Sequence, residues 1–116
     1  MSKFIIERDA RLEFRWRLQA DNYKNILHAS EGYTSKQNCL NSIASVRVNS
    51  QIDERYRNGT SISGQYYFTL HSYPNGETLG ISEMYTTSYS RDEGKKDVKR
   101  EAKDAKIEDR TPVTTY

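Results

Sequence analysis

Residues 30–34 read Ser-Glu-Gly-Tyr-Thr, and the same pattern returns 52 positions later as Ser-Glu-Met-Tyr-Thr over residues 82–86. Comparison of residues 14–48 with residues 66–100 finds seven identical pairs among 35. Outside this Ser-Glu-x-Tyr-Thr signature, the identical pairs are Leu18 and Leu70, Leu27 and Leu79, and Val46 and Val98. Self-similarity at a fixed spacing indicates a structural unit that occurs twice. The sequence therefore predicts a tandem duplication.

Each copy opens with a segment in which apolar and polar residues alternate. The first segment is Phe14-Arg15-Trp16-Arg17-Leu18, and the second is Tyr66-Tyr67-Phe68-Thr69-Leu70. Alternation with a period of two is typical of a β-strand that is buried on one face only. A polar turn follows in each copy, and the second copy carries Asn75-Gly76, a strong hairpin signal. Second strands are predicted over residues 26–30 and 78–82.

A helix is predicted after each signature. Ser35 and Thr87 are the expected N-caps, because a hydroxyl can accept a bond from a free backbone N–H of the first turn. The first helix has an apolar stripe of Cys39, Ile43 and Val46, with Leu40 at its edge. The stripe of the second helix is small and narrow and consists of Gly94, Val98, Ala102 and Ala105. Short extended pieces are expected after each helix, near residues 51–57 and 106–110.

On these residues the chain resembles the YegP-like family, small bacterial proteins that often carry two tandem copies of one unit. The resemblance implies an α+β fold made of two β-β-β-α-β units, with an antiparallel sheet shared by both repeats. It further implies that the repeats exchange their C-terminal strands and that the helices pack on one face. Two departures are Asn22-Tyr23 in place of Asn-Gly at the first hairpin, and Lys95 where the first helix has Ile43. The resemblance implies no reaction, ligand or catalytic residue for this chain.

The length of 116 residues is typical of one domain. We expect a single domain over residues 1–110, with repeats at about 1–55 and 56–110, and a flexible tail over residues 111–116. An internal duplication favours a monomer that acts as a pseudo-dimer. The single cysteine and the short apolar run at the N-terminus predict a cytoplasmic protein with no membrane segment. The 18 basic and 16 acidic residues are too evenly balanced to indicate a polyanionic partner.

The alternation places Arg15 and Arg17 on the sheet face opposite Trp16, and Tyr67 and His71 on the matching face of the second copy. One interpretation is a face that binds single-stranded nucleic acid by stacking and phosphate contact. The other interpretation, which we favour, is an ordinary solvated face. The second helix is read as solvent-facing, because its mixed charges form pairs such as Asp92 with Lys96 and Arg100 with Asp104.

The repeated signature also has two interpretations. Its polar residues either line two symmetric pockets or serve the strand end and the helix start, and we favour the structural role. These residues are Ser30, Glu31, Tyr33, Ser82, Glu83 and Tyr85.

No catalytic, cofactor-binding or metal-binding residue is predicted. Cys39 lies on an apolar stripe, and His28 and His71 do not make a zinc set with it. The sequence therefore favours a non-enzymatic binding or protein-interaction module that uses the open sheet face or an exposed strand edge. The alternative is a nucleic-acid-associated protein.

Overall fold

The computed structural model describes residues 1–111, which form seven strands, two α-helices and one turn of 3-10 helix. In chain order the elements are β1 Lys3–Arg8, β2 Phe14–Gln19, β3 Asn25–Ala29, α1 Lys36–Asn49, η1 Asp53–Arg55, β4 Tyr56–Thr60, β5 Tyr66–His71, β6 Thr78–Ile81, α2 Ser88–Ala102 and β7 Lys106–Asp109. The predicted α+β fold of two related halves is confirmed.

All seven strands form one sheet in the order β4-β5-β6-β3-β2-β1-β7. The halves meet where β3 pairs with β6, with His28 opposite Ile81 and Ala29 opposite Gly80. The final strand, β7, follows the helix of the second half but pairs with β1 of the first half. This is the expected strand exchange. The β1–β7 pair is parallel and the other pairs are antiparallel, so the sheet is mixed rather than purely antiparallel.

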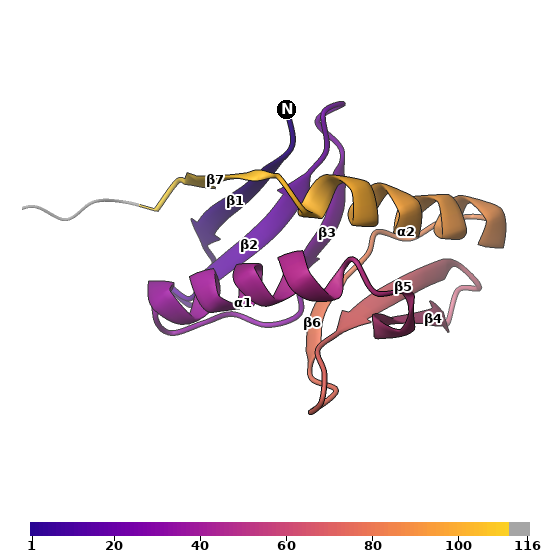
Figure 1. Cartoon of the computed structure of the whole chain (residues 1–116), viewed down its shortest axis with the longest axis horizontal. Coiled ribbons are helices and arrows are strands. Elements are labelled where there is room, and N and C mark those ends of the chain that lie inside the picture. Colours follow the sequence, from indigo (N-terminus) through magenta and orange to yellow (C-terminus); the bar gives the residue numbers. More distant parts are fainter. Residues whose placement is uncertain (112–116) are drawn as a thin grey trace, which may run out of the picture.

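Both helices cover the same face of the sheet, and each lies across strands of both halves (Figure 1). The expected caps form, since Ser35 Oγ accepts from Asn38 N and Thr87 Oγ1 accepts from Ser90 N. Trp16 is almost fully buried beneath α1, and its indole N–H donates to Ser42 Oγ at 3.0 Å. No helix of residues 1–111 lies on the other sheet face, which we call the open face.

The structure differs from the prediction directly after α1. The extended piece expected near residues 51–57 is η1 followed by the start of β4, so the first half has no separate strand after its helix. The expected ion pairs of α2 also differ, because Lys96 contacts Glu93 instead of Asp92 and Arg100 contacts Asp97 instead of Asp104. Each observed pair is three residues apart instead of four. Ala105 is buried as predicted, but it lies beyond the end of α2.

The expected tail lies outside the described residues, except for Thr111. The backbone N–H of Thr111 donates to Asp109 Oδ1 at 2.9 Å, and its side chain is buried.

Candidate functional site

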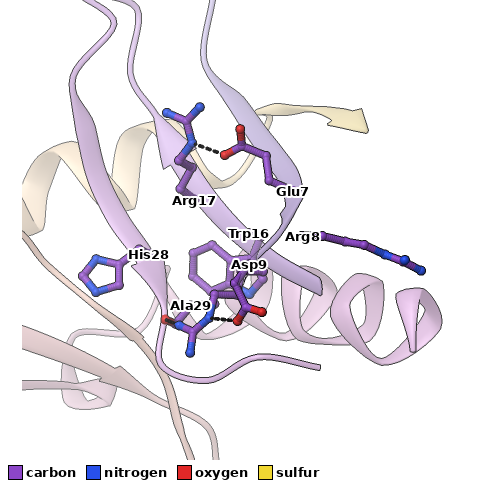
Figure 2. A pocket seen from close by; sticks show the side chains of 8 residues that line it. Glu7, Arg8, Asp9, Trp16, Arg17, His28 and Ala29 are labelled. Atoms are coloured by element: carbon purple, nitrogen blue, oxygen red, sulfur yellow. Dashed lines mark hydrogen bonds and ion pairs between the residues drawn. The ribbon is translucent and has the colours of Figure 1, made fainter. Parts of the chain in front are cut away.

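The arginines of β2 lie on the open face, where carboxylates of the first half hold both of them. Arg17 Nε donates to Glu7 Oε1 at 2.9 Å, and Figure 2 shows these two side chains side by side. Arg15 Nε donates to Asp9 Oδ2 at 2.9 Å. That bond from Arg15, with backbone donors, keeps the pKa of Asp9 below its ordinary value. Each arginine charge is therefore compensated by a neighbour from the β1 side of the sheet.

A shallow hollow of about 290 Å³ lies between these ion pairs and β3. His28 borders it on the strand next to Arg17 (Figure 2). The pKa of His28 is lowered by desolvation and by the charge of Arg15, which favours the neutral imidazole at pH 7. His28 was not among the residues predicted for this face, although its pairing with Arg17 follows from the hairpin register.

Tyr67 and His71 lie on the same face of the second half, but both side chains are already packed against or hydrogen-bonded to other residues of the protein. The Tyr67 ring covers Gly59 of β4 so closely that an added Cβ would come within 2.4 Å of it. His71 is only 7% exposed, and its ring nitrogens contact Thr69 Oγ1 at 2.7 Å and the Gly76 carbonyl at 3.2 Å. The structure thus places the four predicted residues on one face without bringing them into one cluster.

The signature serines and tyrosines connect strands and helices, within each half and, through Ser30, between the two halves. Ser30 Oγ donates to the Thr78 carbonyl at 2.7 Å, and Ser82 Oγ accepts from Phe68 N at 2.9 Å. Tyr33 pairs with Phe14 and Tyr85 with Tyr66 in single antiparallel bridges. The two tyrosines contact their helices differently. Tyr33 donates a hydrogen bond to Ser42 Oγ at 2.9 Å, whereas the Tyr85 ring packs against Gly94.

The signature glutamates line two equivalent polar grooves. Glu31 lies in a groove of about 650 Å³ between α1 and the β5–β6 hairpin. Glu83 lies in a groove of about 450 Å³ between α2 and Lys24 of the β2–β3 hairpin. Lys24 Nζ contacts Glu83 Oε1 at 3.4 Å, and Glu83 Oε2 is buried without a hydrogen-bond partner in the described part of the chain. Desolvation and the charge of Glu83 raise the pKa of Tyr85.

The reactive side chains do not form a chemical centre in residues 1–111. Cys39 is fully buried, and desolvation raises its pKa to about 11, which disfavours the nucleophilic thiolate. Within that range, no three His, Cys, Asp or Glu side chains are grouped so that they could bind a metal ion. No helix of the described chain combines the length and the apolar character that a membrane crossing requires.

The outer side of β4 is a feature that sequence analysis did not locate. β4 pairs with β5 only, and within residues 1–111 no strand lies on its other side, which we call the bare edge. Beside it, Lys95 of α2 donates to Asn58 Oδ1 at 2.7 Å. Lys99 of the same helix contacts Asp53 at 2.9 Å. The repeat could have indicated this edge, because it puts Tyr56 and Asn58 where the first half has Phe4 and Ile6.

Comparison with known proteins identifies both halves. The model of a domain of unknown function, DUF1508, matches the chain twice, over residues 9–56 and 61–109. The chain belongs to the DUF1508 family. The two matches correspond to the two halves, and the resemblance to YegP-like proteins is confirmed.

Relatives of this DUF1508 protein are similar over nearly the whole chain. YegP of Escherichia coli K12 is 39% identical over 108 residues, 93% of this chain and 96% of YegP. A UPF0339 protein of Stutzerimonas stutzeri, encoded in the 5′ region of the ptx operon, is 42% identical over 104 residues, 90% of this chain and 92% of that protein.

Two solution NMR structures share the fold. E. coli yegP, described as a protein of unknown function, superposes with a TM-score of 0.89 at 36% identity, over 97% of this chain and 96% of that one. SO3888 of Shewanella oneidensis gives 0.87 at 33% identity, over 95% and 92%. These names assign no enzymatic reaction, and the function of the family is not established.

Proposed function

We propose that this DUF1508 protein is a non-enzymatic protein-interaction module that binds an extended segment of a partner along the bare edge of β4. The observation that carries the proposal is an asymmetry between equivalent strands. β1 and β4 hold the same place in the two repeats, yet β7 pairs with β1 and no described strand pairs with the outer side of β4. Addition of a strand to an exposed sheet edge is a common mode of peptide recognition.

The covalent chain explains why the segment after α1 does not supply a strand for the bare edge. α1 ends at Asn49 and β4 begins at Tyr56. A parallel strand needs a crossover connection of about a dozen residues or more before its neighbour begins. Residues 50–55 are too few for a strand and a return, so the segment after α1 turns through η1 directly into β4. A second polypeptide has no such restriction.

We propose that residues 1–110 act as one monomeric domain of two repeats in the cytoplasm, and that the signature residues serve folding. The alternative, nucleic-acid binding by Arg15, Arg17, Tyr67 and His71, is less well supported because both arginines already contact carboxylates. If it applied, binding to single strands would weaken with salt, with a log–log slope of about −0.7 per phosphate.

Proline substitution on β4 tests the proposal. Asn58 stands where Ile6 uses its carbonyl to bind β7, so by the alternation of the ladder its backbone N–H points outward. Asn58→Pro removes this donor but no bond to β5, and proline is tolerated on edge strands. Extended peptides are expected to shift the amide signals of β4 in the parent and in Asn58→Ala, but not in Asn58→Pro.

Thr60→Pro, at the next outward position, gives a second test should Asn58→Pro not fold. Circular dichroism and thermal unfolding establish that each variant is folded. Peptide binding that is equally strong in a folded proline variant would contradict the proposal, as would peptide-induced shifts confined to the open face.

A further inference from the structure

The strand β7 shows within this molecule what an added strand looks like. In the parallel register, Ile107 lies opposite Phe4, Glu108 opposite Ile5, and Asp109 opposite Ile6. Glu108 and Asp109 are neighbours in a strand, so their side chains point to opposite faces of the sheet. The incoming strand therefore offers one carboxylate to each face.

A lysine holds each of these carboxylates. Lys3 Nζ contacts Glu108 Oε1 at 2.9 Å on the open face. Lys36 Nζ, at the start of α1, contacts Asp109 Oδ2 at 2.7 Å on the helix face. The Lys36 contact, together with hydrogen bonds from Thr111, lowers the pKa of Asp109 to about 2.

The bare edge offers cations at equivalent places. Arg55 stands where the first half has Lys3. Its Nε is buried and has no hydrogen-bond partner among the described residues, and its guanidinium lies 4.5 Å from the centre of the Tyr73 ring. On the helix face, Lys95 Nζ donates to Asn58, the counterpart of Ile6, at 2.7 Å and contacts Asp92 Oδ1 at the longer distance of 3.5 Å. A carboxylate opposite Asn58 would therefore meet this ammonium group.

The charges around the bare edge also disfavour pairing with a second copy. Its positive residues outnumber its negative ones, and antiparallel pairing of two β4 strands would bring like charges together, which destabilises a sheet. The positive residues are Arg55, Arg57, Lys95, Lys96 and Lys99, and the negative ones are Asp53, Glu54, Asp92 and Glu93.

From this geometry we infer that the partner segment is acidic and adds to β4 as a parallel strand, with an apolar residue followed by two carboxylates. The inference rests on the proposed function and specifies its partner. The apolar residue lies opposite Tyr56, as Ile107 lies opposite Phe4. The first carboxylate binds Arg55, the counterpart of Lys3, and the second binds Lys95 on the helix face.

Two blocked hexapeptides test the inference by titration of the labelled full-length chain, with binding followed by NMR. The acidic probe is Ala-Thr-Ile-Glu-Asp-Thr, and the neutral probe is Ala-Thr-Ile-Gln-Asn-Thr. Two partly exposed ion pairs are expected to make the acidic probe bind about tenfold more tightly at low salt. The shifted amides are expected in β4 and near Lys95.

A matched pair of variants assigns the effect to the helix face. Lys95→Met keeps the aliphatic stem and removes the charge, so it is expected to weaken the acidic probe severalfold and leave the neutral probe unchanged. Lys103→Met removes the same charge directly after the C-terminal end of α2, and it is expected to change the affinity of neither probe.

The possible outcomes separate this inference from the function on which it rests. Equal binding of both probes along β4 overturns the acidic partner but keeps the edge as a docking site. No shift in β4 with either probe, or shifts confined to β1 and β7, overturns both. A concentration-dependent dimer through β4 in sedimentation analysis overturns the inference in favour of a second copy.

Discussion

β1 and β4 occupy the same position in two copies of one unit, but only β1 lies inside the sheet. Phe4, Ile5 and Ile6 are fully buried, whereas Arg57 and Asn58 of β4 are exposed. Both strands still provide an aromatic ring that packs at 5.7 Å from a ring of the next strand, Phe4 with Trp16 and Tyr56 with Phe68. Both repeats thus share the ring contact between neighbouring strands. They differ on the outer side of the strand, which β7 covers in β1 and no described strand covers in β4.

A second difference lies where the signature tyrosines meet the helices. Ser42 of α1 accepts hydrogen bonds from both Tyr33 and Trp16. Its counterpart Gly94 leaves room for the ring of Tyr85. One repeat joins its strands to its helix by a polar contact and the other by close packing, so equivalent positions tolerate different substitutions.

The largest effect is expected in the core of the first half. Trp16→Ala should lower the free energy of unfolding by about 3–5 kcal/mol, because the ring is almost fully buried. Phe68→Ala, its counterpart, is the matched variant for comparing the two halves. Urea denaturation measures both, and a loss below about 1 kcal/mol for Trp16→Ala would mean that the sheet faces are assigned the wrong way round.

An exchange at the helix contact sharpens the second difference. Gly94→Ser introduces the residue found at position 42, but its Cβ would lie 2.2 Å from the Tyr85 hydroxyl. Overpacking is expected to destabilise the protein by about 1–3 kcal/mol, although replacement of a helical glycine normally stabilises by up to about 1 kcal/mol. Urea denaturation gives the sign of the change in the free energy of unfolding, which shows which of the two effects is larger. A stabilised variant would show that Tyr85 moves aside freely.

The two hairpins predict a smaller effect of the opposite sign. Tyr23 has φ +66° in the first hairpin, whereas the second hairpin has Gly76 at φ +68°. A left-handed conformation is unfavourable for a residue with a Cβ, so Tyr23→Gly should stabilise the protein by about 1 kcal/mol. Tyr23→Ala is the control, since it removes the exposed ring but keeps the strained conformation. Equal stabilisation by both variants would assign the effect to the ring.

The smallest effect concerns the covered edge and depends on pH. The pKa of Asp109 is lowered from 3.8 to about 2, so its contact with Lys36 stabilises β7 above about pH 4 and is lost as the pH falls towards 2. Protection factors for amide exchange in β7 should decrease over this range, while those of β5 change less. Asp109→Asn should remove the dependence, and an unchanged profile in that variant would contradict the assignment.

Local patterns in the sequence predicted much of the fold. Alternation with a period of two correctly placed Trp16 and Phe68 inside, and the positions of Ser35 and Thr87 correctly predicted both helix starts. The strand expected after α1 is absent because the connection to β4 is too short, which only the strand order reveals. The sequence alone likewise could not show that Tyr23 adopts a left-handed conformation.

The candidate site was less predictable because it depends on register and on neighbours. Arg15 and Arg17 were placed on the open face, but their partners Asp9 and Glu7 became evident only through the pairing of β1 with β2. His71 has the phase of an exposed residue, yet the hairpin that follows folds over it and contacts its ring. Edges are still harder to find, since nothing within β4 states that its outer side lacks a neighbour.

The exchange of β7 has a consequence for synthesis on the ribosome. β1 is translated before the other six strands of the sheet, while its parallel partner, residues 106–109, is translated after them. The first half therefore emerges with one edge of β1 and one edge of β3 still unpaired, and these backbone edges stay unpaired until the second half has been translated. During that interval the nascent chain needs protection from aggregation most.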